Sequence, residues 1–280
     1  MKKLFFAFLM IIIPLFAQDT TIIMPGYLNI KPFTAYILEP RMGFVFKTNV
    51  NELRLDIGAS RDLLWYKPDW NQTYSFGIDF FTYSLLRKEK DFHFPVDAID
   101  YLFGVNFGYK NDNKNESGVR FRISHISTHM VDGHIDNYRN YDSTKPLTWR
   151  NGIPAKVYSR EFFELIYYYF FHNLRVYGGM TYVFHIDPSY LGDKLFHLGF
   201  DYYFKDLITK NIHLYVAHNL KIHKVNAWKG DNNFQLGIKF GKLNENNFSI
   251  SWCYYKGLNF HGQYYKYNDE YNGVNINFNF

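Results

Sequence analysis

Three residues of the chain have the types and spacing needed for nucleophilic catalysis. His125 and Ser127 are separated by one residue, and Glu161 lies at the start of a later apolar stretch. If residues 118–128 form a β-strand, His125 and Ser127 share one face, and the imidazole can accept the hydroxyl proton. An antiparallel register with 127 opposite 159 would place Glu161 beside His125, where it would orient the ring and stabilise the imidazolium. The spacing predicts an acyl-transfer site with Ser127 as nucleophile, His125 as base and Glu161, or a carboxylate of the following loop, as orienting acid.

A second group of side chains follows directly and has the chemistry of a metal site. It comprises His129, Asp132, His134 and Asp136 in the segment 129–158, which we expect to be the longest loop. Imidazole nitrogens and carboxylate oxygens at this spacing suit a zinc-like divalent ion. The competing interpretation is that they are solvated or capping groups of a loop, and the sequence leaves both open.

The strand that would carry the catalytic residues belongs to a repeated pattern. In the last ten residues Val274, Ile276, Phe278 and Phe280 alternate with asparagines, which gives one apolar and one polar face. Similar alternation predicts twelve strands, at residues 41–49, 51–60, 73–84, 97–110, 118–128, 159–171, 174–185, 194–204, 211–223, 232–241, 247–257 and 271–280. Most of them are long enough to cross a bilayer at a tilt.

Composition agrees with strands that face lipid. The 280 residues are 21% aromatic, with 29 Phe and 25 Tyr, and the single cysteine excludes a disulfide framework. Residues 1–17 have two lysines, an apolar core and a terminal Ala, as in a secretory signal peptide. An exported chain of alternating strands satisfies its backbone in lipid only by closing. We therefore predict an all-β fold: a closed antiparallel transmembrane β-barrel in the bacterial outer membrane, formed by residues 41–280 and preceded by a periplasmic segment, 18–40.

The polar faces predict what fills this barrel. With apolar side chains outward, the lumen receives charges of both signs, which would crosslink and largely fill it. These residues are Arg54, Asp56, Asp79, Asp100, Asn106, Arg120, Arg122, Glu164, Arg175, His197, Asp201, His213 and Lys239. The short links 61–72, 111–117, 172–173, 205–210 and 242–246 are expected at the periplasmic end, and 50, 85–96, 129–158, 186–193, 224–231 and 258–270 outside. A soluble barrel or a two-sheet sandwich is the alternative fold.

The catalytic candidates break the apolar face of their strand. The parity of Val119, Phe121 and Ile123 turns His125 and Ser127 to the lipid side, near the outer headgroups. Polar groups facing lipid are costly and commonly functional. Alternatively the strand bulges or ends near residue 124, and the two side chains only bond loop backbone.

Short motifs here resemble known families. His125-Ile126-Ser127 resembles the His-x-Ser dyad of outer-membrane phospholipase A, a likeness that implies calcium dependence and a homodimer, although Thr128-His129 replace that family's Asn-Gly. It also resembles the dyad of the lipid A 3-O-deacylases, in which a neighbouring Glu completes the triad. A broader likeness is to an uncharacterised bacterial family of outer-membrane barrels with a His-x-Ser-Ser-His-x-x-Asp-Glu signature, from which Thr128 and Gly133 depart. That likeness is carried by Ile30-Lys31-Pro32-Phe33, Pro40-Arg41, His125 to Asp132, Tyr158 to Glu161 and Arg175 to Gly179.

Three functions remain open from the sequence. The first is hydrolysis of acyl esters of outer-leaflet lipids, the second a structural or binding barrel without catalysis, and the third a narrow channel. The expected partners are outer-membrane lipids and the barrel-assembly machinery, which would engage the C-terminal strand ending in Phe280. The full chain has a net charge of +5, and loss of Lys2 and Lys3 with the signal peptide would leave +3, an excess too small to indicate nucleic acid. No cofactor is certain; Ca²⁺ or another divalent ion is the candidate.

Overall fold

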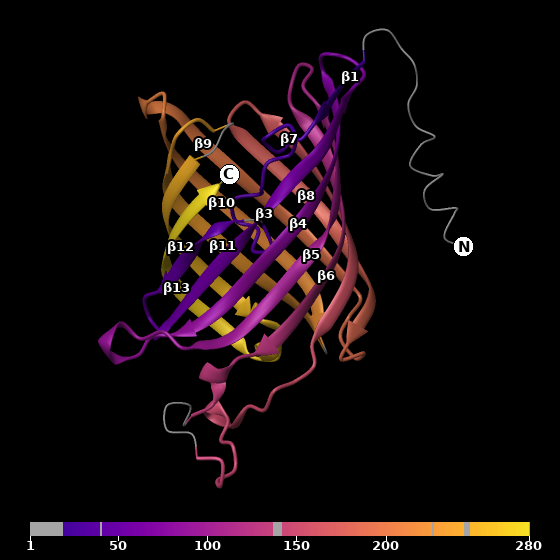
Figure 1. Ribbon diagram of the computed structural model, residues 1–280. Coiled ribbons are helices and arrows are strands. Elements are labelled where there is room, and N and C mark those ends of the chain that lie inside the picture. Colours follow the sequence, from indigo (N-terminus) through magenta and orange to yellow (C-terminus); the bar gives the residue numbers. More distant parts are fainter. Residues whose placement is uncertain (1–18, 40, 137–141, 226, 244–246, 280) are drawn as a thin grey trace, which may run out of the picture.

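The chain forms a closed barrel of twelve antiparallel strands with one short strand outside it (Figure 1). The computed structural model describes residues 19–279 apart from 40, 137–141, 226 and 244–246. The predicted signal peptide and Phe280 therefore lie outside the described residues. The strands are β1 (Thr20–Ile23), β2 (Met42–Lys47), β3 (Glu52–Lys67), β4 (Gln72–Arg87), β5 (Val96–Asn111), β6 (Ser117–Met130), β7 (Ser159–Phe171), β8 (Leu174–Asp187), β9 (Lys194–Thr209), β10 (Ile212–Val225), β11 (Ala227–Phe240), β12 (Asn247–Leu258) and β13 (Asn268–Asn279).

Four 3₁₀ helices lie in the links of the described part of the chain: η1 (Lys90–Phe92), η2 (Asp132–His134), η4 (Arg150–Gly152) and η5 (Gly262–Tyr264). In these described residues no helix is long and apolar enough to cross a membrane. Closure comes from β13, which pairs with β2 through Ile276 opposite Phe44, so that no edge remains between the two ends of the sheet.

Each of the twelve predicted strands coincides with a strand of the barrel, and β7 has the predicted bounds. The predicted turn 61–72 is wrong, because β3 continues to Lys67. A bulge between Asp62 and Leu64 reverses the alternation, so that Leu64 faces out and Trp65 faces in. The loop expected at 224–231 is also too long, because β11 already begins at Ala227.

The two ends of the barrel differ. The turn end carries the short links β3–β4, β5–β6, β7–β8, β9–β10 and β11–β12, as well as the outside strand β1, which pairs with the end of β3. The loop end carries the longer segment between β6 and β7 and the segment between β12 and β13. In Figure 1 the turn end is at the top and the loop end at the bottom.

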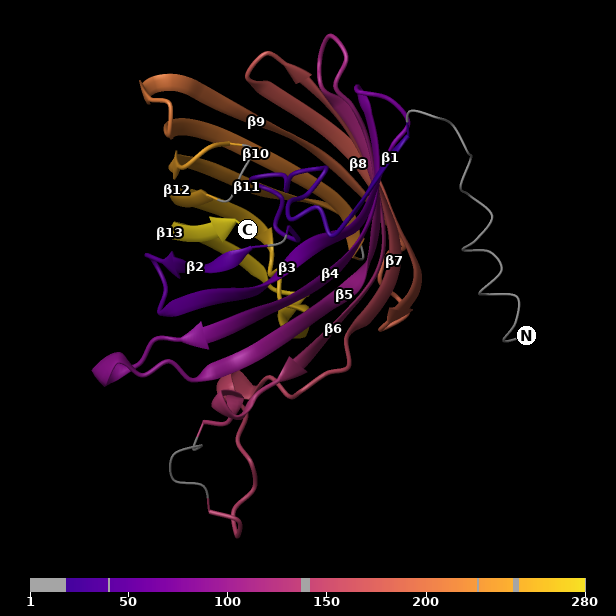
Figure 2. The same ribbon diagram turned by 45° about the horizontal axis from the view of Figure 1, so that its top comes forward.

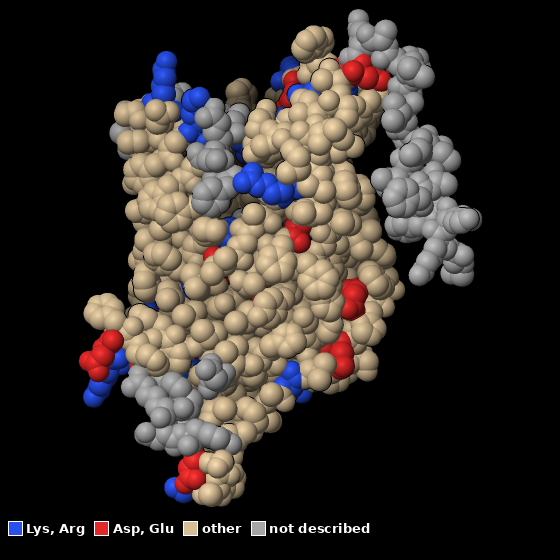
Figure 3. Space-filling view, viewed as in Figure 1, with Lys and Arg blue, Asp and Glu red and all other residues tan. Residues whose placement is uncertain are grey.

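The strand faces divide as the alternation predicts. Every residue predicted to face the lumen is buried, including Asp100, Arg122 and Glu164. The outward face is a band of large apolar side chains, among them Ile78, Phe80, Phe103, Phe107, Phe163, Leu165, Met180, Leu198, Leu236, Trp252 and Val274. In Figure 3 charged side chains are sparse over the middle of the face shown and gather toward its two ends. This is the surface that a lipid bilayer requires of a barrel.

The N-terminal segment lies within the lumen. Residues 27–39, which we call the plug, run inside the ring of strands (Figure 2), whereas the sequence predicted only a periplasmic segment leading to the barrel. Phe33 and Tyr36 of the plug are fully buried; the ring of Phe33 lies 4.3 Å from that of Tyr177, and that of Tyr36 lies 4.8 Å from His197. The interior is therefore a packed core with polar crosslinks.

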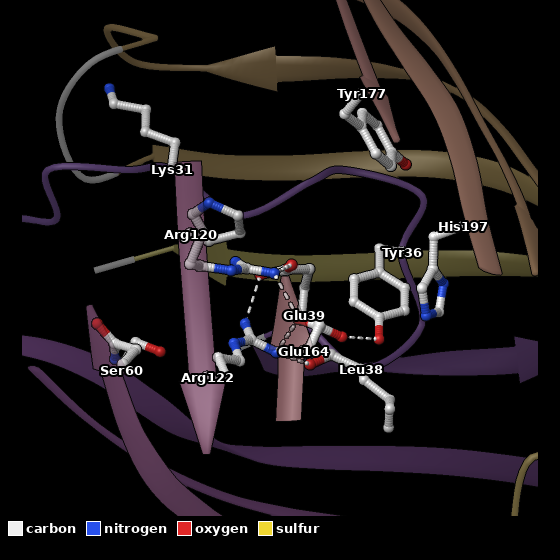
Figure 4. A network of polar contacts seen from close by, with 12 residues as sticks. Lys31, Tyr36, Leu38, Glu39, Ser60, Arg120, Arg122, Glu164, Tyr177 and His197 are labelled. Atoms are coloured by element: carbon white, nitrogen blue, oxygen red, sulfur yellow. Dashed lines mark hydrogen bonds and ion pairs between the residues drawn. The ribbon is translucent and has the colours of Figure 1, made fainter. Parts of the chain in front are cut away.

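Ion pairs join the plug to the wall (Figure 4). Glu39 accepts hydrogen bonds from both Arg120, at 2.9 Å, and Arg122, at 3.1 Å. The wall carboxylate Glu164 also contacts both arginines, at 3.3 and 3.7 Å, and accepts a hydrogen bond from the Tyr36 hydroxyl. A buried charge is tolerable only when it is paired in this way. Buried ion pairs and hydrogen bonds between Glu39 or Tyr36 and the wall residues therefore hold the plug in the barrel.

The segment after β12 closes the lumen at the loop end. His261 donates from Nδ1 to Asp100 at 2.6 Å, and the backbone N–H of Gly262 donates to the same carboxylate at 2.9 Å. A Cβ at Gly262 would lie 2.2 Å from both Thr128 and Tyr158, so only glycine fits against this wall. The segment between β12 and β13 therefore folds into the lumen at the loop end.

Candidate functional site

The predicted pairing of the catalytic candidates is present in the structure. Strands β6 and β7 are in the register that places Ser127 opposite Ser159 and His125 opposite Glu161. His125 Nδ1 lies 2.5 Å from Glu161 Oε1, and both side chains are about one quarter exposed on the outside of the barrel. The strand continues to Met130 without a bulge at residue 124, and Ile126 points inward, as the parity predicts.

Ser127 has a different imidazole as its partner. Its hydroxyl lies 3.5 Å from His129 Nε2, two residues farther along the same outward face. His129 is exposed, and its ring lies 5.6 Å from that of Tyr101. The sequence predicted that one histidine would contact both the carboxylate and the serine. In the structure His125 contacts Glu161, whereas His129 contacts Ser127.

A third histidine completes this surface cluster and was missed from the sequence. Glu161 directs its second oxygen, Oε2, at Nδ1 of His185 on β8. Strict alternation along β8 would put His185 inside, with Arg175 and Tyr177. A bulge between the pairs Glu161–His185 and Phe162–Val183 reverses the parity and turns His185 outward. The alternation gave no signal for the outward position of His185, because the bulge that produces it depends on the pairing with β7.

The surroundings of the cluster are apolar. The ring of His125 lies against Phe103 at 4.8 Å between centroids, and Phe163 and Phe184 are exposed on the neighbouring strands. Ser159 donates to Glu161 at 3.5 Å. A hydrogen-bonded cluster of imidazoles, hydroxyls and one carboxylate therefore interrupts the lipid-facing band near the loop end. Such a cluster can move protons and, through Ser127, attack an ester.

Of the four residues predicted as metal ligands, the structure describes the side chains of His129, His134 and Asp136. His134 is buried: its Nδ1 lies 2.5 Å from Asp97 Oδ1 and its Nε2 lies 2.6 Å from the Ile153 carbonyl oxygen, so both ring nitrogens already have protein partners. His129 is exposed on the outer face, and the Asp136 backbone N–H bonds to Thr148. The side chain of Asp132 lies outside the described residues, so the four-residue site stays a prediction.

Calcium was the other candidate ion, through the likeness to phospholipase A. It prefers six or more oxygen ligands. The outward cluster has one carboxylate, Glu161, and both of its oxygens already contact imidazoles. Within the described residues, no group of three or more His, Cys, Asp or Glu side chains has the geometry of a metal site. Calcium does not fit this cluster, and no step is derived through it.

Comparison with known proteins gives a family. A family model described as "Protein of unknown function (DUF1207)" matches residues 96–280, which is more than half of the chain and includes β5 to β13. The chain belongs to this family. No curated protein matches this DUF1207 member. Among solved structures it is similar to a "CymD monoaromatic hydrocarbon channel", with a TM-score of 0.41 and 8% identity over 85% of this chain and 76% of that one.

It is also similar to the "translocator domain of autotransporter NalP from Neisseria meningitidis", with a TM-score of 0.36 and 9% identity over 86% of this chain and 85% of that one. The matched part of the DUF1207 chain contains His125, Ser127, Glu161 and His185, whereas the plug lies before it. The family description assigns no activity to these residues.

Proposed function

We propose that this protein is an integral outer-membrane barrel that hydrolyses acyl esters of outer-leaflet lipids at its outward cluster. The observation that carries the proposal is the pair His125–Glu161, formed at 2.5 Å on the lipid-facing surface with Ser127 two residues away on the same face. A carboxylate that orients an imidazole beside a hydroxyl is the minimal arrangement of a serine hydrolase. The position at the loop end would place it at the outer headgroups, if that end faces outward.

The reaction follows from the protonation that Glu161 imposes. His125 donates its Nδ1 proton to Glu161, which leaves Nε2 as a base. Ser127 Oγ attacks the ester carbonyl carbon while Nε2 takes the hydroxyl proton. The tetrahedral intermediate then collapses, the ester C–O bond breaks, and the leaving alkoxide takes the proton from His125. A water molecule, deprotonated by the same Nε2, attacks the acyl-serine and releases the fatty acid and Ser127.

One movement is required. Ser127 must turn from His129 to His125, which is a change of χ1 between staggered rotamers. Its present contact with His129, at 3.5 Å, is at the limit of a hydrogen bond and is weak. His129 is the alternative base, but within the described residues its exposed ring has no carboxylate partner, whereas His125 has Glu161.

The filled lumen is the reason to place activity on the outside. Among the described residues, the plug and the segment around η5 occupy the lumen apart from a cavity of about 720 Å³ at the turn end, which argues against a wide channel. The remaining alternative is a barrel in which the outward cluster only links β6, β7 and β8. Both alternatives give a protein without esterase activity.

The test is fatty-acid release from phospholipid and lipid A by the full-length barrel in mixed micelles. Ser127→Ala should lower the rate to the uncatalysed background. Ser117→Ala is the matched control, because Ser117 lies on the same strand at the turn end and also faces outward. Equal rates for the wild type and Ser127→Ala would refute the hydrolase proposal.

Two further variants assign the base. His125→Ala should abolish release, whereas His129→Ala should retain most of it, since Glu161 contacts His125 beside Ser127 and the structure gives it no contact with His129 within the described residues. The opposite result would make His129 the base. Membrane location is tested separately by fractionation: recovery of the expressed protein in the inner membrane or the soluble periplasm contradicts it.

A further inference from the structure

A small cavity lies inside the barrel at the loop end, on the other side of the wall from the outward cluster. It has a volume of about 40 Å³ and is lined by β7, β10, β11, the link from β8 to β9 and the segment that follows β12. At about 10–15 Å³ for each water, this space holds about three waters. Its charged lining residues are Arg160, Lys221, Lys224 and Asp231, and Phe260 is among the apolar ones. The cavity therefore suits a small charged head group whose body extends into the barrel mouth.

Arg160 has no counter-charge within the described part of the chain. Among those residues its guanidinium has neither a hydrogen bond nor a carboxylate at ion-pair distance, and its Nε atom is buried. The guanidinium carbon lies 5.2 Å from the centre of the Tyr158 ring. By contrast, a carboxylate lies at ion-pair distance from each of the fully buried arginines of the lumen: Arg41, Arg54, Arg120, Arg122 and Arg175. An interior cation without a partner is costly, so an anionic ligand would stabilise Arg160.

The carboxylate in this lining cannot supply the missing charge. Asp231 Oδ1 accepts a hydrogen bond from the Leu258 N–H at 2.9 Å, and its Oδ2 lies 2.7 Å from Lys221 Nζ and 3.0 Å from His223 Nε2. Both oxygens of Asp231 therefore already have partners. An ammonium group has three protons to donate, so Lys221 has donors left for a ligand. The described lining residues carry three permanent positive charges against one negative charge.

The donors of the cavity favour a phosphate over a carboxylate. A carboxylate has two oxygens, and the fork of Arg160 alone would bind both of them. A phosphate monoester has three terminal oxygens, and it carries about two negative charges above its second pKa of about 6. It can accept two hydrogen bonds from Arg160 and one from Lys221, and it balances the positive charge that Asp231 leaves over.

We propose that this cavity binds the phosphate group of a phosphate monoester. Arg160 binds two of the phosphate oxygens, Lys221 binds the third, and the ester body extends past the exposed Lys224 into the mouth of the barrel. The phosphate belongs either to a soluble ester or to a lipid head group that reaches over the rim. The site is separate from the proposed hydrolysis, because Arg160 lies opposite the inward residue Ile126, whereas its neighbour Glu161 faces outward.

The experiment is isothermal titration calorimetry of the full-length barrel in detergent, at constant ionic strength and at about pH 8, where the monoester carries both charges. The probes are phenyl phosphate, benzoate and benzyl alcohol, which share a ring and differ in the head group. Phenyl phosphate should bind at one site about tenfold or more tightly than benzoate, because it makes the additional charged hydrogen bond with Lys221. Uncharged benzyl alcohol should give no saturable binding.

Nanodiscs distinguish the two sources of the phosphate. The phenyl phosphate titration is repeated with the barrel in discs that contain phosphatidic acid, a lipid phosphate monoester, and in discs that contain phosphatidylglycerol, a diester. Loss of binding in the phosphatidic acid discs alone assigns the site to a lipid head group. Binding retained in both kinds of disc supports a soluble ester. Loss in both kinds would contradict a site that selects monoesters.

Variants locate the binding. Arg160→Gln should weaken phenyl phosphate binding about tenfold or more, because the charged donors of the fork are lost. Arg61→Gln is the matched control and should leave the affinity unchanged, since Arg61 is exposed on β3 and its guanidinium donates to the Gly26 carbonyl at 3.0 Å. Folding of each variant is checked by its heat-dependent mobility on gels.

A measurement on the wild type decides the matter if Arg160→Gln does not fold. Phenylglyoxal, which modifies arginine, is applied with and without phenyl phosphate, and the modified peptides are quantified by mass spectrometry. Phenyl phosphate should protect Arg160 and leave the reactivity of Arg61 unchanged. The proposal is overturned by any one of four results: no saturable binding of phenyl phosphate, equal affinities for phenyl phosphate and benzoate, unchanged affinity in Arg160→Gln, or no protection of Arg160.

Discussion

The plug offers the sharpest test of how the interior is held together. The perturbation is Glu39→Gln, which keeps the shape of the side chain but removes the charge that Arg120 and Arg122 share. Because Glu39 is buried and its neighbours are wall residues, the substitution acts between the plug and β6. It should loosen the plug without opening the strand pairing.

The size of the effect follows from the contacts that remain. Removing one partner of a buried ion pair costs about 3–5 kcal/mol when the other charge is left alone. Here the arginines are not left alone: Arg120 keeps Glu164 at 3.3 Å, and Arg122 keeps Asp79 at 3.4 Å. Two positive and two negative charges remain, so we expect the lower end of the range, about 3 kcal/mol.

The assay is hydrogen exchange of the backbone amides, read by mass spectrometry of the folded barrel in detergent. A loss of about 3 kcal/mol corresponds to exchange about a hundredfold faster in the plug, residues 27–39, with the wall strands unchanged. Glu270→Gln, on an exposed carboxylate of β13, is the control and should change neither region. Unchanged exchange in the plug, or equal acceleration in plug and wall, would refute the reasoning.

Two further predictions concern the outward cluster and Lys31. Under the proposed hydrolase mechanism, Glu161→Gln should lower kcat by about 10³- to 10⁴-fold, as loss of the orienting acid does in serine hydrolases. His185→Gln should lower kcat far less, since His185 contacts only the other oxygen of that carboxylate. Equal losses of kcat in the fatty-acid release assay would contradict this division of roles. The lowered pKa of Lys31, about 7, means that the unfolded chain binds more protons between pH 7 and about 10.5, so the free energy of unfolding should rise across that window. Denaturant titrations of the wild type and Lys31→Met measure this, and the variant should have the smaller rise; identical pH profiles would show that Lys31 is not responsible.

Local geometry explains how much could be predicted from the sequence. Side chains alternate across a strand by covalent necessity, so the polar and apolar faces of residues 159–171 or 271–280 can be assigned without coordinates. The same argument predicted that His125 faces outward and that Arg122 and Glu164 face inward, which the structure confirms. The pairing of His125 with Glu161 followed from one assumed register, which is the register found.

Strict alternation of side chains cannot predict a β-bulge, in which one strand has an extra residue relative to its partner. The bulges in β3 and β8 each shift the parity of everything beyond them, and they hid the end of β3 and the outward position of His185. A bulge depends on how two strands pair across the sheet, and neither strand records it alone.

The amino-acid sequence by itself thus determined the class of fold, the closed wall and the side of the wall on which most side chains lie, because these follow from a repeat of two residues. Only the tertiary structure decided that residues 27–39 enter the lumen, that Ser127 contacts His129, and that a cavity remains between Lys31 and Lys239. These features depend on contacts between segments far apart in the chain, such as Glu39 with Arg120. The free energy of such contacts comes from burial and charge pairing in the closed barrel, so a local sequence pattern cannot predict them.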